Sequence, residues 1–235
     1  MTDYSRTNNK PGVIFDAITS IGLGKPGGSR ANEPGQTSAS GGILRFVLGL
    51  DCRFTLYRWV HHFTPVAVEA AGPCRHTASV RWFADETYVK VAGVWRYVYR
   101  AVDEHGQVID VLVSARRDMA AARRFFVRML AVHEDPEEIT TDRAPALAAV
   151  IAELLPAAVH DTEQYANNRM ECDHGRLKAC LRPMRGLKTI QSARTIIGGH
   201  AFIQNLRRGH YELGLEARHS RLRVAAAFGE LARAI

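Results

Sequence analysis

Three acidic residues stand at positions where regular structure could hold them for chemistry, although they are far apart in the sequence. Asp85 falls inside the strand-like run Trp82–Val91, which is unusual because strands disfavour aspartate. Asp142 ends the short strand-like run Glu138–Asp142, and Glu171 stands near the start of a basic, helical segment. Only the fold can bring these three carboxylates together.

Carboxylates that converge in this way are suited to divalent cations. Ligands gather at strand ends in α/β sheets, and Asp85 and Asp142 would lie side by side if their strands were neighbours. Two like charges at that distance repel each other unless a cation lies between them, and Mg²⁺ prefers carboxylate, water and phosphate oxygens. Two such ions, roughly 3.5–4 Å apart, promote phosphodiester hydrolysis and transfer without a protein nucleophile. We therefore expect Asp85, Asp142 and Glu171 to bind two Mg²⁺ ions, which Mn²⁺ can replace.

Two of these acids also have a purely structural interpretation, whereas Asp85 within a strand is harder to explain in this way. Asp142 could cap the helix that follows it, and Glu171 could interact with the dipole of its own helix. The neighbouring acids Glu86 and Asp173 are expected to point away from the site. Glu171 and His174 form an i, i+3 pair of the kind found in di-iron helical bundles, but the predicted strands argue against a bundle.

Basic residues accumulate in the C-terminal third of the chain. Of the 235 residues, those from Ala166 to Arg223 include twelve Lys or Arg against four Asp or Glu, while the whole chain carries a net charge of +7. This uneven charge predicts a polyanionic partner, most commonly a nucleic-acid backbone, against the alternative of an ordinary solvated surface. Lys178 lies seven positions after Glu171, so a helix would place both on one face, where the lysine could grip the phosphate of the strand that is cut. The predicted DNA-binding residues are Arg58, His61, Arg176, Lys178, Arg182, Arg185 and Lys188.

The elements that must position these residues follow from hydrophobic patterning. β-Branched and aromatic residues predict three antiparallel strands joined by short turns, and later runs add two more strands and several helices. The predicted order, βββαβαβαα, is a mixed α/β sheet of about five strands flanked by helices. The expected strands are 82–91, 94–102, 108–114, 138–142 and 157–160, and the expected helices are 55–62, 118–132, one that begins near Pro145, 170–181 and 189–213.

Several residues are expected to set the ends of these helices. Thr55 is a plausible N-cap for the first helix, and Pro65 should stop it soon after residue 62. Asp118 should cap the helix that follows the third strand. Gly198 and Gly199 should interrupt or bend the last long helix.

Cysteine usage and hydropathy bear on the compartment. The four cysteines show no CxxC spacing, so free thiols in a reducing cytosol are the expectation. A zinc site built from Cys52, Cys74 and the nearby histidines would match no usual ligand spacing. No signal peptide is recognisable, and no apolar stretch reaches the ~18 residues of a membrane span. We expect a cytoplasmic, nucleoid-associated protein with no membrane partner.

Several stretches of the chain resemble the DDE transposases of bacterial insertion sequences, specifically insertion-sequence family six. They are spread between Pro73 and Leu213 and together are highly specific. The matching stretches are Arg81–Lys90, Trp95–Asp103, Thr141–Pro145, Asn167–Lys178 and Gly199–Phe202.

The resemblance implies a retroviral-integrase-like, RNase H-like fold. In it, Asp85, Asp142 and Glu171 would form the catalytic, metal-binding triad, with Lys178 as the basic residue after the glutamate. The resemblance also implies cleavage of DNA at the terminal inverted repeats of a small mobile element. The freed 3′-hydroxyl would then attack target DNA by a replicative route that forms cointegrates. The partners would be double-stranded DNA and further copies of the chain, as a homodimer or higher oligomer on DNA.

The chain departs from the family pattern in two places. The 28 residues between Asp142 and Glu171 are fewer than usual, and residues 1 to about 52 look foreign to the family. Leu56–Val60 and Thr64–Pro65 resemble only the end of the family's helix-turn-helix. The expected organisation is therefore a mostly disordered, Gly-, Ser-, Asn- and Pro-rich segment 1–42, a partial helix-turn-helix remnant 43–72, an RNase H-like DDE catalytic domain 73–215 and a C-terminal helical tail 216–235.

Two further functions compete with transposition. One is a catalytically silent remnant that only binds DNA or sequesters full-length partners, which the altered N-terminus favours and the intact acids oppose. The other is an RNase H-type nuclease acting on hybrids, which shares the acids but lacks support from the C-terminal motifs. A serine or tyrosine recombinase would need a covalent nucleophile in a suitable cluster, and we recognise none.

Overall fold

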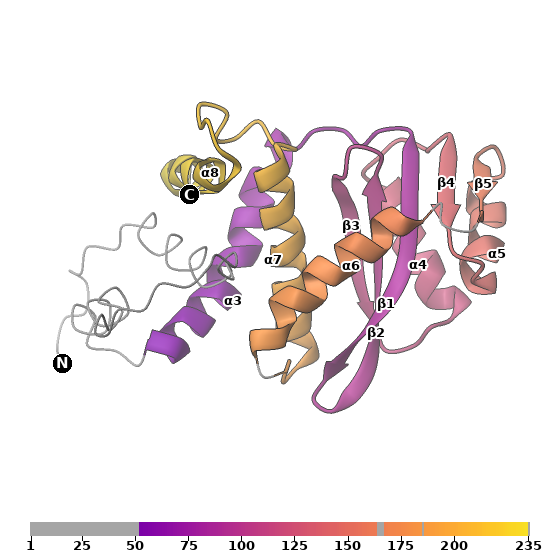
Figure 1. Cartoon of the computed structure of the whole chain (residues 1–235), viewed down its shortest axis with the longest axis horizontal. Helices are drawn as coiled ribbons and strands as arrows, with labels where there is room; N and C mark the ends of the chain where they lie inside the picture. Colours follow the sequence, from indigo (N-terminus) through magenta and orange to yellow (C-terminus); the bar gives the residue numbers. More distant parts are fainter. Residues whose placement is uncertain (1–51, 164–166, 185, 235) are drawn as a thin grey trace, which may run out of the picture.

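A five-stranded sheet forms the centre of the computed structural model, which describes residues 52–163, 167–184 and 186–234. The strand order is β3-β2-β1-β4-β5. β1, β2 and β3 form an antiparallel meander, whereas β4 runs parallel to both β1 and β5. This is the mixed sheet of the RNase H-like fold, as predicted (Figure 1). The strands are β1 (Arg81–Val91), β2 (Val94–Asp103), β3 (Val108–Ser114), β4 (Glu138–Thr141) and β5 (Val159–Asp161).

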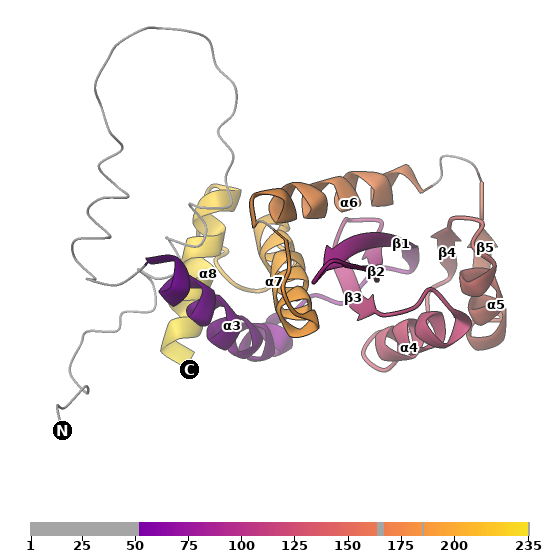
Figure 2. The same cartoon turned by 90° about the horizontal axis from the view of Figure 1, so that it is seen from below.

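Helices cover both faces of this sheet. Alternation along β1 explains the two layers: Trp82 and Ala84 join the core on the side of α4 and α5, whereas Val89 and Val91 pack toward α6 and α7. Figure 2 shows α6 on one side of the sheet and α4 on the other. These helices are α4 (Met119–Leu130), α5 (Pro145–Leu154), α6 (Asn168–Leu181) and α7 (Ile190–Arg208).

Two more helices pack against α7, away from the sheet (Figure 1). They are α3 (Cys52–Ala71) and α8 (Ser220–Ala234). Their shared core centres on Phe202 of α7, whose ring makes edge contacts with Tyr211 and with Phe228 of α8. Helix α7 therefore connects the sheet to a three-helix cluster. Short 3₁₀ turns, η1 (Gly72–Cys74) and η2 (Arg182–Met184), follow α3 and α6.

The first helix is longer than predicted. The expectation of a helix over 55–62 that Pro65 stops is wrong, because α3 begins at Cys52 and continues through Pro65 to Ala71. Proline removes one backbone hydrogen bond from a helix. Packing offsets this loss, since Ala67 and Ala71 are buried against α7 and α8. The described part of segment 43–72 is a single helix followed by η1, so the helix-turn-helix remnant stays a prediction.

Helix α7 also differs from its prediction. It ends at Arg208 rather than near residue 213, because Gly209 adopts a left-handed conformation (φ 84°) and its N–H caps the helix. Gly198 and Gly199 lie within the continuous helix. A Cβ at Gly199 would stand only 2.9 Å from Thr64 Cγ2, so this glycine permits the close crossing of α3 and α7.

Other predicted boundaries are confirmed. Asp118 is the N-cap of α4, and its side chain accepts a hydrogen bond from the Ala121 N–H at 2.8 Å. Pro145 begins α5. The predicted disordered segment 1–42 lies outside the described residues, and α8 falls within the predicted helical tail 216–235. Among the helices that the structure describes, none is both long and apolar enough to cross a membrane.

The turn between β1 and β2 carries one unfavourable residue. Val91 pairs with Val94, so Ala92 and Gly93 form a two-residue loop, and both have positive φ angles, of 49° and 81°. Such loops favour Asn-Gly, because an L-residue with a Cβ rarely adopts this conformation. We predict that Ala92→Asn raises the free energy of unfolding by about 0.5–1 kcal/mol, measured by urea denaturation.

Gly93→Ala provides the matched control. Open space surrounds its Cβ position, so only the positive φ opposes the substitution, which should destabilise the protein. Equal stability of the wild type and both variants would show that this turn is relaxed in solution.

Candidate active site

The parallel pairing of β1 with β4 brings two of the predicted acids together. Its last aligned pair is Ala84 with Thr141, so Asp85 and Asp142 occupy the next position of each chain segment. β4 ends at Thr141, which leaves Asp142 beyond the ladder. One carboxylate oxygen from each of Asp85, Glu86 and Asp142 lies within 4.8 Å of the other two. The two strands are neighbours, which is the condition under which Asp85 and Asp142 were expected to lie side by side.

Glu86 belongs to this cluster, so the prediction that it points away is wrong. Successive strand residues face opposite sides of a sheet. However, Asp85 and Glu86 lie just past the end of β4, where Asp142 can approach both from the edge. The Glu86 side chain is buried and contacts Arg117 Nε, and Arg117 Nη2 lies 3.6 Å from Asp142 Oδ2. Arg117 was not predicted as part of the site, since only the tertiary fold brings it to these acids.

Burial and mutual repulsion make the cluster electrostatically unfavourable as it stands. Burial, followed by the charge of Asp142, raises the pKa of Asp85 to about 7. The same two causes raise the pKa of Glu86, against the opposing influence of Arg117. Arg117 is thus the cation that offsets part of the negative charge in this structure.

The donor set fits a hard divalent cation. It consists of carboxylate oxygens within bridging distance, and the buried Glu86 Oε2 has no hydrogen-bond partner among the described residues. The raised pKa of Asp85 reflects burial and the nearby charge of Asp142. A divalent cation would offset this negative charge. The predicted site for Mg²⁺ or Mn²⁺ is therefore chemically compatible with these side chains.

Asp142 takes part in the local turn as well as in the cluster. Its Oδ1 accepts a hydrogen bond from the Ala144 N–H at 3.1 Å, which shapes the approach to α5. Asp142 is not the N-cap of that helix: Ala144 occupies the cap position, without a side-chain cap. The helix-cap interpretation of Asp142 is therefore wrong, whereas its place in the acid cluster is compatible with metal binding.

Glu171 lies beside the cluster rather than inside it. It is exposed in the first turn of α6 and is outside the group of acids that share a 4.8 Å neighbourhood in the described chain. Met170 anchors this turn, because its buried side chain packs in a cluster with Val102. One turn further on, His174 Nδ1 lies 3.7 Å from Asp85 Oδ2. Because residues i and i+3 share a helix face, Glu171 lies on the side of α6 that approaches Asp85.

His174 meets Asp85 as a neutral ring. Burial, then the charges of Arg100 and Lys178, lower the pKa of His174 to about 4. At neutral pH the contact with Asp85 is therefore not an ion pair. His174 Nε2 is also buried and has no hydrogen-bond partner within the described part of the chain.

A buried ionic network holds α6 in place. Within the described chain, Asp173 lies outside the acid cluster and pairs with the fully buried Arg100 of β2, which stands opposite Asp85 in the β1–β2 ladder. Its other oxygen accepts a hydrogen bond from Arg208 Nη2 of α7 at 3.2 Å. Arg100 also donates to Gln204 Oε1 at 2.7 Å. Burial lowers the pKa of Arg100, and Asp173 counteracts this effect. The network joins β2, α6 and α7 two residues away from Glu171.

The predicted DNA-binding residues on and after α6 are mostly exposed. Lys178 Nζ lies 5.3 Å from the centre of the Tyr88 ring of β1. Arg185 lies outside the described residues. The other three, Arg176, Arg182 and Lys188, are exposed.

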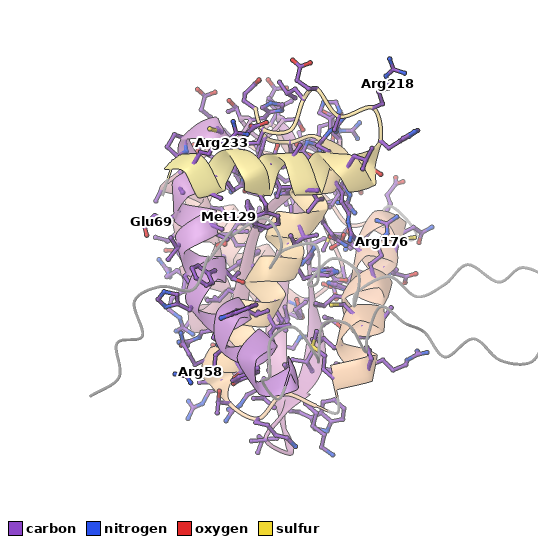
Figure 3. All side chains as sticks on the ribbon, turned by 90° about the vertical axis from the view of Figure 1, so that its left-hand side faces the viewer. Arg58, Glu69, Met129, Arg176, Arg218 and Arg233 are labelled. Atoms are coloured by element: carbon purple, nitrogen blue, oxygen red, sulfur yellow. The ribbon has the colours of Figure 1, made fainter. Side chains whose placement is uncertain are left out.

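The two predicted DNA-binding residues of α3 differ from each other. Arg58 is exposed, and Figure 3 shows it well apart from Arg176 of α6. The His61 ring packs 4.4 Å from the Tyr57 ring, and its Nε2 is buried without a hydrogen-bond partner among the described residues. This packing favours a structural role for His61.

Comparison with known proteins identifies related sequences. The family model described as the DDE domain matches residues 79–210. The transposase for insertion sequence-like element IS431mec of Staphylococcus aureus strain Mu50 is 33% identical over 129 residues, which are 53% of this chain and 58% of that protein. The transposase for insertion sequence element IS257 in transposon Tn4003, also from Staphylococcus aureus, gives the same values. The chain thus spans 58% of the length of these relatives.

Solved structures with a similar arrangement are more distant. The HTLV-2 integrase catalytic core domain in complex with magnesium superposes with a TM-score of 0.45 and 16% identity, over 63% of this chain and 97% of that one. A simian T-cell lymphotropic virus intasome gives the same TM-score with 18% identity, over 63% of this chain and 55% of that one. The strand order and directions, not these superpositions, establish the fold.

The crowded acids predict a pH-dependent stability in metal-free buffer. The pKa of Asp85 rises from 3.8 to about 7 on folding. The folded state therefore loses stability as the pH rises through this interval, and the loss is complete above about pH 7. We predict that Asp85→Asn stabilises the protein at pH 8 in EDTA by on the order of 2 kcal/mol. Thermal unfolding between pH 4 and pH 8 tests this prediction. The difference in stability between Asp85→Asn and the wild type should shrink toward pH 4.

Asp135→Asn is the control, because Asp135 is an exposed acid in a loop. Its stability difference from wild type should stay near zero at every pH. A destabilised Asp85→Asn protein at pH 8 would contradict the assigned electrostatics.

The buried network predicts a large effect of removing one charge. Asp173→Asn leaves Arg100 buried without its counter-ion, which should lower the free energy of unfolding by about 3–5 kcal/mol in urea denaturation. The exposed pair between Arg123 and Glu153 is the control. Glu153→Gln should cost less than about 1 kcal/mol. Similar decreases in the free energy of unfolding for the two variants would show that the network does not hold α6.

Proposed function

The chain belongs to the DDE transposases of insertion-sequence family six, and from that membership we propose that it cuts DNA strands at the ends of an insertion sequence and joins them to target DNA. The reaction proposed is metal-dependent cleavage at the terminal inverted repeats, followed by attack of the freed 3′-hydroxyl on target DNA. The protein would then be a polynucleotidyl transferase that needs no covalent nucleophile of its own.

One observation carries this proposal: Asp85 and Asp142 meet through the β1–β4 ladder, within the stretch matched by the DDE domain model. We propose that Glu171 completes the triad. Its exposed carboxylate lies one turn from His174, which already approaches Asp85. Asp85, Asp142 and Glu171 would hold two Mg²⁺ ions, or Mn²⁺ in their place. When bound, these ions activate the attacking oxygen and stabilise the leaving oxygen.

The protein side chains would position the DNA for this reaction. Lys178 carries its ammonium over the Tyr88 ring, three positions along β1 from Asp85, where it can bind a phosphate of the cut strand. Arg117 can move from the acids to a phosphate once cations replace its charge. Arg176, Arg182, Arg185 and Lys188 would extend the basic surface along the duplex, with Arg58 contributing from α3.

Transposition also requires an assembly, because the two ends of an element must be cut and joined together. We propose a homodimer or higher oligomer on double-stranded DNA, acting in the cytoplasm at the nucleoid by a replicative, cointegrate-forming route. The family membership and the basic C-terminal third support this proposal.

One observation favours a second candidate, a DNA-binding remnant without catalysis. The family match begins at residue 79, and the preceding α3 packs into the cluster with α7 and α8. Such a protein could bind DNA or pair with full-length relatives while failing to assemble on element ends.

Strand nicking distinguishes the two candidates. The substrate is a labelled duplex that carries the terminal repeat of the element, incubated with Mn²⁺. We predict nicking by the wild type and a loss on the order of a thousandfold or more for Asp142→Asn and for Glu171→Gln. Binding of the duplex without any nicking would favour the remnant.

Glu86→Gln serves as the matched control, because Glu86 shares the cluster but is not assigned to the triad. Glu86→Gln should lower the nicking activity by no more than about 10- to 100-fold, as for residues that support metal ligands. If Glu86→Gln abolished nicking while Glu171→Gln did not, Glu86 would be the third ligand.

A further inference from the structure

Two aromatic rings are left in solvent on the β1–β2 hairpin. Tyr88 and Trp95 keep 56% and 54% of their surface exposed, whereas Trp82 and Tyr99 on the same two strands are buried. β4 pairs with β1 only as far as Ala84, so the rest of the hairpin extends past β4 (Figure 1). Packing within the described chain therefore leaves these rings largely uncovered.

The two rings form one platform, and each carries a lysine. Their centroids lie 5.1 Å apart at an angle of 88°, an edge-to-face pair. Lys90 Nζ lies 5.5 Å over Trp95, and Lys178 Nζ lies 5.3 Å over Tyr88. In an edge-to-face pair, one ring points its edge at the face of the second ring. Both faces of the first ring are then free of contact with the second. With one lysine over each ring, at least one aromatic face stays open to a ligand.

The platform begins beside the acid cluster. Tyr88 follows Glu86 by two residues in an unbroken ladder, so both side chains stand on the same face of the sheet, about 7 Å apart. Trp95 is on that face too, because it pairs with Lys90. Lys178 reaches Tyr88 from α6, which covers the opposite face. Helix α6 also carries His174, which contacts Asp85.

This combination identifies the chemistry of the ligand. Aromatic rings flanked by ammonium groups bind single-stranded nucleic acid, since bases stack on the rings and phosphates pair with the cations. A base inside a duplex has both faces covered by its neighbours, so only an unpaired base can stack. A partner protein is the other possible occupant, but the two lysines and the adjacent phosphodiester chemistry favour DNA.

We propose that Tyr88 and Trp95 bind an unpaired base of the DNA strand that lies at the acid cluster, with Lys90 and Lys178 on the flanking phosphates. This inference rests on the proposed function and adds to it a preference for DNA that is frayed or single-stranded next to the cut. The platform would hold the strand end away from its complement while the reacting phosphate lies at the acids.

DNA binding in Ca²⁺, which replaces Mg²⁺ without supporting cleavage, tests the proposal. Fluorescence anisotropy compares a blunt duplex with the same duplex bearing three unpaired nucleotides at one end. We expect the wild type to prefer the unpaired end by about tenfold, and Tyr88→Ala or Trp95→Ala to lose that preference while binding the blunt duplex normally. Tyr88→Phe and Trp95→Phe should keep it, because a phenyl ring still stacks.

Val127→Ala is the control, since Val127 is an exposed apolar residue on α4, and it should bind both duplexes like the wild type. Wild-type binding that ignores unpaired nucleotides would overturn this proposal and leave the transposase assignment intact. Failure to bind either duplex would overturn both. A changed oligomeric state of the alanine variants in sedimentation, with unaltered DNA preference, would show instead that the platform is a contact between copies.

Discussion

The parallel ladder between β1 and β4 is the constraint on which the site depends. It aligns Asp85 with Asp142 at the point where β4 ends, although burial and repulsion oppose two adjacent carboxylates. The free energy to hold them comes from the hydrophobic core on the α4 and α5 side, to which Trp82, Ala84 and Ile139 of the two strands belong. The fold thus maintains an excess of negative charge that a divalent cation can relieve.

The second constraint acts on α6. The Arg100–Asp173–Arg208 network joins this helix to β2 and α7, while Met170 packs beneath its first turn. These contacts flank Glu171, whose own side chain stays exposed. The backbone of α6 is therefore held in place, while the Glu171 side chain is exposed and free to change its conformation. A buried ionic network suits this task because its geometry is directional, whereas apolar packing tolerates small shifts.

Sequence reasoning could find the strands and two of the acids, because β-branched patterning and an aspartate within a strand are local signals. The predictions were wrong where contacts between residues far apart in the chain determine the structure. The pairing of Arg117 with Glu86 and of Arg100 with Asp173 joins residues that are far apart in the chain. Pro65 was expected to end a helix, but burial of Ala67 and Ala71 against α7 and α8 carries the helix onward. Gly198 and Gly199 were expected to interrupt or bend α7, but the helix continues through both, and Gly199 admits Thr64 of α3. Such roles depend on the partner helix, which local sequence does not specify.

The position of bound metal would show whether Asp85, Asp142 and Glu171 form one cation site. Crystals soaked in Mn²⁺ and measured at the manganese absorption edge locate the ions independently of activity. We predict anomalous peaks between Asp85 and Asp142, with the Glu171 carboxylate turned inward as a ligand and Glu86 still paired with Arg117. A peak held by Asp85, Glu86 and Asp142 with Glu171 in solvent, or no peak at these acids, would contradict it.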